Sequence, residues 1–379
     1  MTKGVSNDNL LIEGFSTQSG RVLTASKRYE VRIMLDDRKL KVLYSIIDSY
    51  IETAEPIGSR TISKEYNLGV SAATIRNEMS DLEELGYLSK PHSSAGRIPS
   101  DKAYRLYVNN FLKIKDRVSD ELVNEKIKEI LVKESWEVEN LLENSAKVLS
   151  ALTDYTALVA SPKMKNSIVE HIQLVPVDNL GILIVIVCNT GKVKNTIYKS
   201  EEPISLDQLN TISNFLNSKL KGLSIDEMLT KLNTNIFKEI YEFKNVIDDL
   251  IPIINNSIED LVSVELYSEG VSNILNFPEY KDIEKAKEFM SFVENKDIIL
   301  DMLSETSSSK DIDIIIGNEN IYTPIKDLSI ITATYQIGGK TIGKVGLIGP
   351  TRMDYINLIN TIKAFSTNIT EMLNLLMRS

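Results

Sequence analysis

The sequence predicts an α+β protein of several domains, and three observations lead to this fold class. Its 379 residues are enough for two or three separate hydrophobic cores. Apolar residues recur at helical spacing through the first part of the chain. Further along, strand-like segments come first, then a helical stretch over residues 203–275, and then strand-like segments again. This order predicts an α+β domain that is interrupted by a helical insertion.

The composition is that of an ordinary globular protein, with 42% hydrophobic and 25% charged residues and a formal net charge of -10. The longest apolar run, Ile182–Cys188, is far shorter than the ~20 residues of a membrane-spanning helix and predicts a buried strand instead. Cys188 is the single cysteine, which excludes an internal disulfide. The N-terminal residues MTKGVSNDNLLIEGF lack the apolar core of a secretory signal. We therefore expect a cytoplasmic protein without a membrane partner.

The chain opens with a polar segment and two expected helices. Residues 1–33 show no periodicity, so we expect either a disordered arm or a segment upstream of the true start at Met34. Asp36 can then cap a first helix. The apolar positions of this helix recur at helical spacing: Leu40, Leu43, Tyr44, Ile47, Tyr50 and Ile51. A second, shorter helix is expected to begin at Ser59.

A third helix is expected after a turn at Gly69, a residue suited to the positive φ of a tight turn. Ser71 can cap this helix at its start, and Gly86 is suited to end it. Its apolar residues fall on one face: Ile75, Met79, Leu82 and Leu85. A short helix, a glycine turn and a longer helix are the pattern of a helix-turn-helix.

A small hairpin is expected after the third helix. Residues 87–91 and 97–99 are short strand-like segments, and residues 92–96 between them are rich in Ser and Gly. A hairpin in this position is the wing of a winged helix-turn-helix domain, which we place over residues 34–110.

The face of the third helix opposite its apolar residues suits the major groove of DNA. It carries small and polar residues: Ala72, Ala73, Arg76, Asn77 and Ser80. The guanidinium of Arg76 can bind guanine, and the amide of Asn77 can bind adenine or a phosphate. An ordinary solvated helix face is the alternative interpretation. The preceding glycine turn and the following wing favour DNA binding.

The predicted DNA-binding domain has no excess of positive charge. Residues 34–110 contain ten Lys and Arg and eleven Asp and Glu residues, a net charge of -1. Phosphate contacts must therefore come from a few placed groups, with Arg105 as a further candidate. The acidic residues from Glu78 to Glu84 are expected on helix turns that lead out of the groove. The predicted DNA-binding residues are Arg60, Lys64, Ser71, Ala72, Thr74, Arg76, Asn77, Ser80, Lys90, His92, Ser93, Ser94 and Arg97.

Two other candidate motifs, a phosphate-binding loop and a zinc site, lack the residue spacing that such sites need. Gly339-Lys-Thr341 could be the end of a phosphate-binding loop, whose motif is G-x-x-x-x-G-K-[ST] followed by a helix. Here Thr334 stands at the position of the first glycine, and a strand is expected after the motif. A hairpin turn at Gly338-Gly339 accounts better for this stretch. The two histidines stand 79 positions apart, which is no zinc-ligand spacing. The loop with Arg352 and Asp354 is expected either to anchor a helix or to hold a small ligand. We predict no catalytic centre, metal site or cofactor, and no enzyme.

Two stretches far apart in the chain resemble one known family. They are SAATIRNEMSDLEELGYL, followed by SSAGRIPSDKAYRLYV, and DLSIITATYQIGGKTIGKVGLIGPTRMDY near the C-terminus. In this order they resemble the heat-inducible transcription repressor HrcA, and the resemblance extends from about Met34 to the end of the chain.

The resemblance implies a bacterial repressor that binds, as a homodimer, the inverted-repeat operator CIRCE in double-stranded DNA upstream of chaperone operons. It also implies that a GroE-type chaperonin maintains the active repressor, which loses activity on heat stress. The rival hypothesis is a metabolite-sensing transcription regulator with the GAF-like domain as its sensor. The resemblance implies three parts: a winged helix-turn-helix domain (34–110), a GAF-like domain (151–202 and 276–379) and a helical dimerising domain inserted within it (203–275). From the sequence itself, the charged helical stretch over residues 111–150 is expected to be a connector helix.

Overall fold

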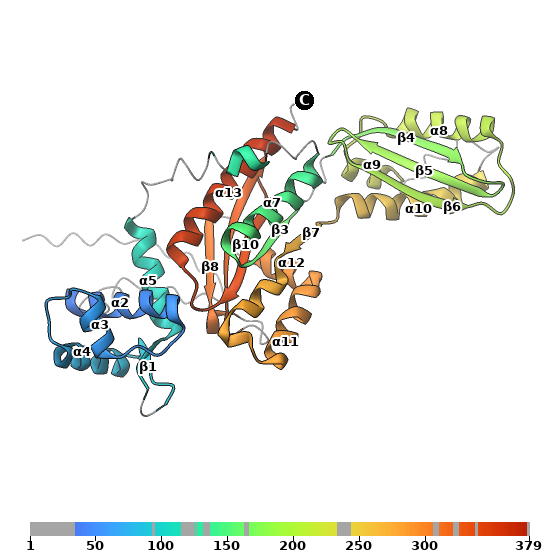
Figure 1. Ribbon diagram of the computed structural model, residues 1–379. Helices are drawn as coiled ribbons and strands as arrows, with labels where there is room; N and C mark the ends of the chain where they lie inside the picture. Colours follow the sequence, from blue (N-terminus) through green and yellow to red (C-terminus); the bar gives the residue numbers. More distant parts are fainter. Residues whose placement is uncertain are drawn as a thin grey trace, which may run out of the picture. The chain divides into compact units, whose positions relative to one another are not determined.

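The structure, a computed structural model, describes residues 35–92, 95–114, 125, 127–131, 137–162, 167–232, 244–305, 311–320, 326–337 and 340–376. Helices and sheets both occur in it, which confirms the predicted α+β class (Figure 1). The described chain forms two compact units. The first holds the chain up to Asp48 and Pro56–Ile98, and the second holds Ser49–Glu55 and the chain from Pro99 onward. The segment predicted as an arm, residues 1–33, lies outside the described residues.

The first unit contains the elements expected from the sequence, in the expected order. Asp36 begins the first helix, because its Oδ1 accepts a hydrogen bond from the backbone N–H of Lys39 at 2.7 Å. The core of the unit includes fully buried Ile46, Ile62 and Ile75. The elements are α2 (Asp37–Thr53), α3 (Ser59–Glu65), α4 (Ala72–Glu84), β1 (Leu88–Ser89) and β2 (Ile98–Pro99).

A five-stranded antiparallel sheet, in the order β7-β3-β10-β9-β8, is the centre of the second unit. Its strands are β3 (Thr156–Ala160), β7 (Leu266–Glu269), β8 (Ile312–Ile316), β9 (Leu328–Ile337) and β10 (Lys340–Pro350). The helices of this part are α5 (Asp101–Ile114), α7 (Val138–Thr153), α11 (Ile283–Glu294), α12 (Lys296–Glu305), α13 (Tyr355–Leu376) and the 3-10 helices η3 (Val271–Asn276), η4 (Pro278–Tyr280) and η5 (Gly317–Glu319).

Helices cover both faces of this sheet because its strands carry apolar residues on both sides. Ile330 packs in one core with Phe289 of α11 and Ile299 of α12. Ser329, the neighbour of Ile330, points to the opposite face, where its Oγ lies 2.7 Å from the hydroxyl of Tyr355 in α13. A sheet that is buried on both sides leaves helices and loops as the free surface of this part of the chain.

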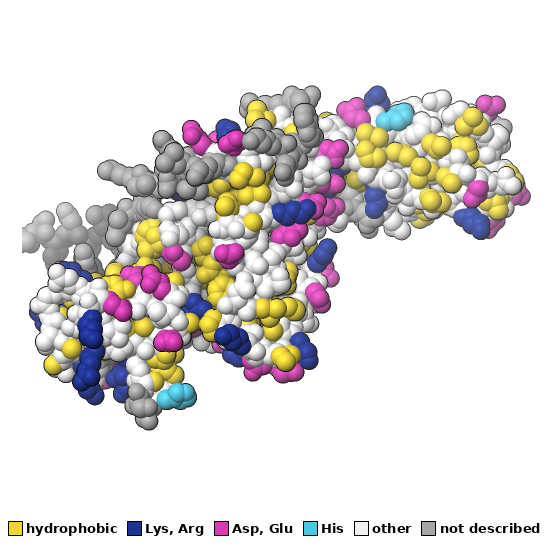
Figure 2. Space-filling model, viewed as in Figure 1, with side chains coloured by type: hydrophobic (Ala, Val, Ile, Leu, Met, Phe, Trp, Pro, Cys, Tyr) yellow, Lys and Arg dark blue, Asp and Glu magenta, His cyan; other side chains and the backbone are white. Residues whose placement is uncertain are grey.

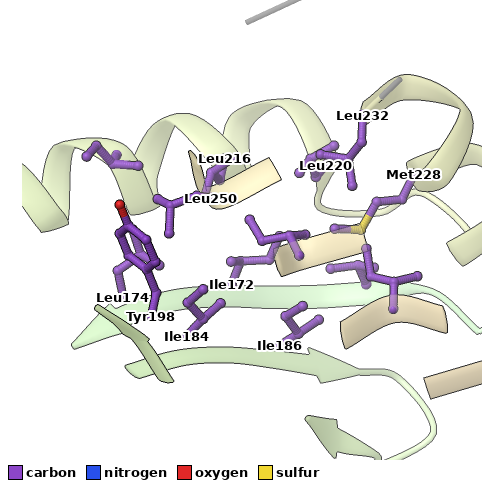
Figure 3. Packing of buried hydrophobic residues seen from close by; sticks show 14 of the residues in the cluster. Ile172, Leu174, Ile184, Ile186, Tyr198, Leu216, Leu220, Met228, Leu232 and Leu250 are labelled. Atoms are coloured by element: carbon purple, nitrogen blue, oxygen red, sulfur yellow. The ribbon is translucent and has the colours of Figure 1, made fainter. Parts of the chain in front are cut away.

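Three further strands form a separate antiparallel sheet in the order β4-β5-β6 (Figure 1). Helices α8, α9 and α10 pack on it, and the core between them includes Ile172, Ile184, Leu216, Met228 and Leu250 (Figure 3). The bounds of these elements are β4 (Val169–Pro176), β5 (Gly181–Cys188), β6 (Val193–Lys199), α8 (Leu206–Leu220), α9 (Ile225–Leu232) and α10 (Lys244–Val262).

This arrangement corrects the predicted limits of the insertion at residues 203–275. Strands β4–β6, assigned from the sequence to the sheet of residues 151–202, pack with the helices that follow them. Strand β7, assigned to the insertion, pairs with β3 in the five-stranded sheet. The inserted segment therefore begins after β3 and ends before β7. Local sequence patterns show that a strand forms but not which sheet it joins.

The glycine-rich stretch near residue 340 is a strand pair, as the sequence predicted. Strands β9 and β10 pair antiparallel from Lys340 opposite Ile337 to Pro350 opposite Leu328. Lys340 and Thr341 thus lie on a strand and not at a helix start, so the stretch is no phosphate-binding loop. The expected turn, Gly338-Gly339, lies outside the described residues.

The loop that follows β10 anchors the chain. Arg352 is buried and forms an ion pair with Glu279, whose Oε2 accepts from Nη2 at 3.2 Å. Asp354 caps α13, since its Oδ1 accepts from the backbone N–H of Asn357 at 3.3 Å. Among the described residues, no helix is long and apolar enough to cross a membrane. Within the same residues, no three His, Cys, Asp or Glu side chains lie close enough to hold a metal ion.

Candidate nucleic-acid interface

Helix α4 has well-defined ends. Its N-cap is Ser71, whose Oγ accepts a hydrogen bond from the backbone N–H of Thr74 at 3.2 Å. Gly69 before the helix and Gly86 after it have positive φ values of +68° and +76°, which L side chains rarely adopt. Both helix limits agree with the sequence prediction.

One face of α4 is buried and the other is exposed. Ile75, Met79 and Leu82 lie in the core. The exposed side carries Ala73, Arg76, Asn77 and Ser80, as predicted, and Ala72 and Thr74 are half-buried at its margin. The small side chains on either side of Arg76 and Asn77 allow the helix backbone to approach base edges closely.

The helix that packs beside α4, α3, carries exposed basic residues. Arg60 and Lys64 of α3 are both exposed. Several Lys and Arg side chains stand side by side on the surface of the N-terminal helices (Figure 2). His92 at the start of the wing loop is exposed as well, while Ser93 and Ser94 lie outside the described residues.

The wing is joined to the loop between α2 and α3 by backbone pairing. The backbone N–H groups of Ile57 and Arg97 each donate to the other residue's carbonyl oxygen, at 2.9 and 2.8 Å. Gly96 lies next to this pair, and a Cβ atom on it would be 2.5 Å from the carbonyl carbon and oxygen of Ile57. Only glycine therefore allows this close approach.

Two acidic residues of α4 hold it to α2. Glu78 is buried, and its carboxylate lies 2.9 Å from Nζ of Lys39 and 3.6 Å from Nη1 of Arg38. Asp81 lies 3.1 Å from the same Lys39 ammonium. The hydrogen bonds that the Lys39 ammonium donates to Glu78 and Asp81 raise the pKa of Lys39, so this lysine stays charged.

A third acidic residue of α4, Glu83, holds the wing. Its Oε2 lies 2.8 Å from Nε of Arg97 and 3.4 Å from Nζ of Lys90. Both basic residues were predicted to bind phosphates, and the structure gives each of them an intramolecular partner. Lys90 keeps 39% of its side chain exposed and Arg97 only 15%, so Lys90 has more freedom to reach DNA.

The structure does not support a DNA contact for Arg105. This residue lies on α5, which groups with the second unit. Its guanidinium forms an ion pair with Glu319 and donates to the carbonyl oxygen of Ile314 at 2.6 Å. These acceptors engage Nε and Nη2, so the guanidinium is held on the second unit.

Sequence analysis missed the structural role of the acidic residues on α4, which it placed on turns leaving the DNA. One signal was present for Glu78. It falls three positions after Ile75 and four before Leu82, so it shares the apolar face and should be buried. A buried carboxylate needs a cationic partner, and Lys39 fills this role.

Comparisons with known proteins agree with the resemblance seen in the sequence. A family model described as "HrcA protein C terminal domain" matches residues 139–359. A protein of Alkaliphilus metalliredigens named "Heat-inducible transcription repressor HrcA" is 42% identical over 341 residues, which cover 90% of this chain and 98% of the relative. A protein of the same name from Ruminiclostridium cellulolyticum is 42% identical over 345 residues, or 89% of this chain and 97% of the relative.

A crystal structure described only as that of a hypothetical protein is also similar. It is 27% identical, has a TM-score of 0.65 and is matched over 90% of this chain and 99% of its own. The family model covers more than half of the chain, and the named relatives match over nearly their whole length. The protein described here therefore belongs to the HrcA family.

Proposed function

We propose that this protein is a transcription repressor of heat-shock chaperone operons and binds double-stranded DNA through a winged helix-turn-helix domain in its first unit. The observation that carries the proposal is the free face of α4, where Arg76 and Asn77 stand exposed among small residues. Helix α3, the turn at Gly69 and the hairpin β1–β2 surround it in the order typical of such domains. The names of the relatives support the same function.

In this proposal α4 contacts bases in the major groove, while neighbouring basic groups contact the phosphates. Arg76 binds guanine and Asn77 binds adenine through their planar groups. Arg60, Lys64 and Lys90 bind the backbone. Arg97 supports the wing through Glu83 and binds phosphate only where its remaining N–H groups reach it. The five-stranded sheet with helices on both faces supports a GAF-like assignment for the second unit.

A salt titration tests whether placed phosphate contacts supply the affinity. Two to four contacts per protomer predict, for a dimer, a slope of log K against log salt concentration between about -4 and -7, because each phosphate contributes about -0.9. The slope is measured by fluorescence anisotropy with a chaperone-operon inverted repeat. A slope near zero would contradict the phosphate contacts.

An inverted-repeat operator requires a two-fold symmetric protein, and we propose that the inserted segment forms the dimer contact. The helices of this segment bury their apolar sides on one face of the β4–β6 sheet. No element of the described residues covers the other face, which is apolar: Val175, Leu183 and Ile197 lie in one row across the three strands. Ile197 is 67% exposed and Val193, on the same face, 56%. Figure 2 shows apolar side chains along these strands.

A second copy of this chain is the occupant that suits this face. The three rows of paired residues across it hold apolar or uncharged polar side chains and one histidine, His171, so two copies meet without like-charge repulsion. Apolar patches of this kind on otherwise polar proteins mark interaction sites. The sequence had placed the dimer surface within residues 203–275, but the helices of this segment use their apolar sides to pack on their own sheet.

The substitution Ile197→Asp is expected to convert a dimer to a monomer, because it would bury two unpaired carboxylates across the contact. Size-exclusion chromatography with light scattering measures the molar mass. Ile283→Asp is the matched control: Ile283 is 70% exposed at the start of α11, outside the proposed surface, and should leave the mass unchanged. A dimer that persists in Ile197→Asp would place the contact elsewhere.

The family resemblance further supports CIRCE as the operator and a GroE-type chaperonin as the partner that maintains the active form. The test is binding to a chaperone-operon inverted repeat, with and without chaperonin, before and after heating. If DNA binding survives heating only when chaperonin is present, the proposed regulation by chaperonin is supported.

The alternative of a metabolite sensor gains no support from the loop at Arg352, because its guanidinium is already paired with Glu279.

A further inference from the structure

The last turn of α4 carries a carboxylate at a position that an isolated helix disfavours. Glu83 lies one residue before the end of the helix at Glu84. The aligned peptide dipoles place partial negative charge at a helix C-terminus, so a carboxylate there lowers the stability of the helix. Residues 81–84, which form this turn, include no basic residue. The cations that balance Glu83 come from the wing instead.

A tight turn after α4 brings the first of these cations back beside the helix. The backbone N–H of Gly86 donates to the carbonyl oxygen of Glu83 at 2.9 Å. The N–H of Tyr87 donates to the carbonyl oxygen of Leu82, also at 2.9 Å. Together these bonds form a Schellman motif, which requires the positive φ of +76° found at Gly86. The chain reverses here, and Nζ of Lys90 comes to lie 3.4 Å from Oε2 of Glu83.

The second cation reaches the same carboxylate from the other strand of the wing. Nε of Arg97 lies 2.8 Å from Oε2 of Glu83. This nitrogen is buried, so a DNA phosphate cannot take the place of Glu83 at it. The backbone pair between Ile57 and Arg97 holds the same strand independently of the ion pair. The wing therefore keeps its position when Lys90 leaves Glu83.

The contact between Lys90 and Glu83 can open far more easily. The Lys90 side chain is 39% exposed, against 15% for Arg97. Ion pairs with this much exposure to solvent are weak, because water screens both charges. A DNA phosphate offers the ammonium another anionic partner, and binding to it releases counterions from the DNA. Glu83 and the phosphate therefore compete for the same ammonium group.

We propose that Glu83 is an internal competitor of the DNA phosphate and thereby limits the affinity of the repressor for every DNA sequence. The inference rests on the proposed function, in which Lys90 contacts the backbone. Lys90 has to leave Glu83 before it binds a phosphate, so the free energy of the ion pair lowers the binding free energy. The reduction is the same for operator and random DNA, and discrimination between them stays with α4. Glu83 acts through Lys90 and does not touch DNA.

The experiment compares the full chain with its Glu83→Gln variant. Glutamine has the size of glutamate and keeps an oxygen that can accept from Arg97, but it lacks the charge that holds Lys90. Fluorescence anisotropy measures binding to a chaperone-operon inverted repeat and to a random duplex of equal length. The variant should bind both about three- to tenfold more tightly, with an unchanged ratio of the two affinities. Dissociation from the operator, followed after adding excess competitor DNA, should be slower.

A double-mutant cycle shows whether the effect acts through Lys90. In Lys90→Ala protein, the further change Glu83→Gln should leave both affinities as they are, because the ammonium for which Glu83 competes is absent. Lys90→Ala should also cost more affinity in Glu83→Gln protein than in the unmodified chain. A residue with only a structural role in α4 would produce no such coupling.

Glu84→Gln is the matched control, because it removes the same charge from an exposed residue of the same helical turn. Its effect should stay below about twofold at physiological salt, which screens exposed charges over about 8 Å. Circular dichroism checks that each variant is folded.

Three results would overturn the competitor proposal alone: no tighter binding by Glu83→Gln, tighter binding that persists without Lys90, or an equal effect of Glu84→Gln. An unmodified chain that binds neither duplex would overturn the proposed function, and the competitor proposal with it.

Discussion

Arg76→Ala is expected to lower operator affinity by roughly one to two orders of magnitude and to relax discrimination at a single base pair. A bidentate contact to one base contributes about 1–3 kcal/mol of discrimination, and Arg76 is exposed on the free face of α4 without a role in the core. The measurement is a competition assay with operators that carry each single base change. Thermal unfolding of the variant should match that of the unmodified chain.

The control for this prediction is Arg60→Ala on the neighbouring helix. Arg60 is exposed and proposed to bind a phosphate, so its loss should weaken all sequences equally and make the salt slope shallower by about one per protomer. If Arg76→Ala leaves discrimination between operator bases unchanged while Lys90→Ala changes it at particular bases, the wing reads the bases and α4 contacts the phosphates, the reverse of the proposal.

Gly96→Ala is expected to detach the wing and remove most of the operator affinity. The added methyl group meets the backbone of Ile57 at 2.5 Å, and backbone cannot move aside as a flexible side chain can. The two backbone hydrogen bonds between Ile57 and Arg97 should be lost, at a cost of about 2–3 kcal/mol for the first unit. Chemical denaturation monitored by circular dichroism, and anisotropy with the operator, measure the two effects.

Gly58→Ser is the matched control for the wing. Gly58 is the N-cap of α3, has an ordinary φ of -98°, and a Cβ atom there would meet only the Thr61 hydroxyl at 3.9 Å. Serine is a favoured N-cap residue, so this variant should be as stable as the unmodified chain. A Gly96→Ala protein with unchanged stability and operator affinity would show that the wing tolerates separation from Ile57.

The local elements of the first unit could be predicted from the sequence because their signals are local. A cap at Ser71, a glycine at each end and apolar residues at helical spacing define α4 within one or two residues. The exposed face follows from the same spacing. The ion pairs of Glu83 could not be predicted, because they depend on how closely the wing approaches α4 in three dimensions.

The limits of the inserted segment could not be predicted for a related reason. Strands β3 and β5 are both short, continuous apolar runs, and either sheet would satisfy such a pattern. The limits of the insertion are set by the pairing of β3 with β7, two strands that lie on opposite sides of it in the sequence.

Helix α10 lies in the stretch predicted as helical, although it contains Pro252, which the structure places inside the helix.

The same pairing of β3 with β7 has a consequence for the order of folding. The two strands are separated by roughly a hundred residues, and closing a flexible loop of that length costs about 4 kcal/mol of chain entropy. A folded insertion avoids this cost, because it holds its two ends close together as a short turn does. Its two ends already meet where Ser161 donates its backbone N–H to the carbonyl oxygen of Glu265 at 2.7 Å. The insertion should therefore fold before the β3–β7 edge of the five-stranded sheet, and that edge should open when the insertion melts.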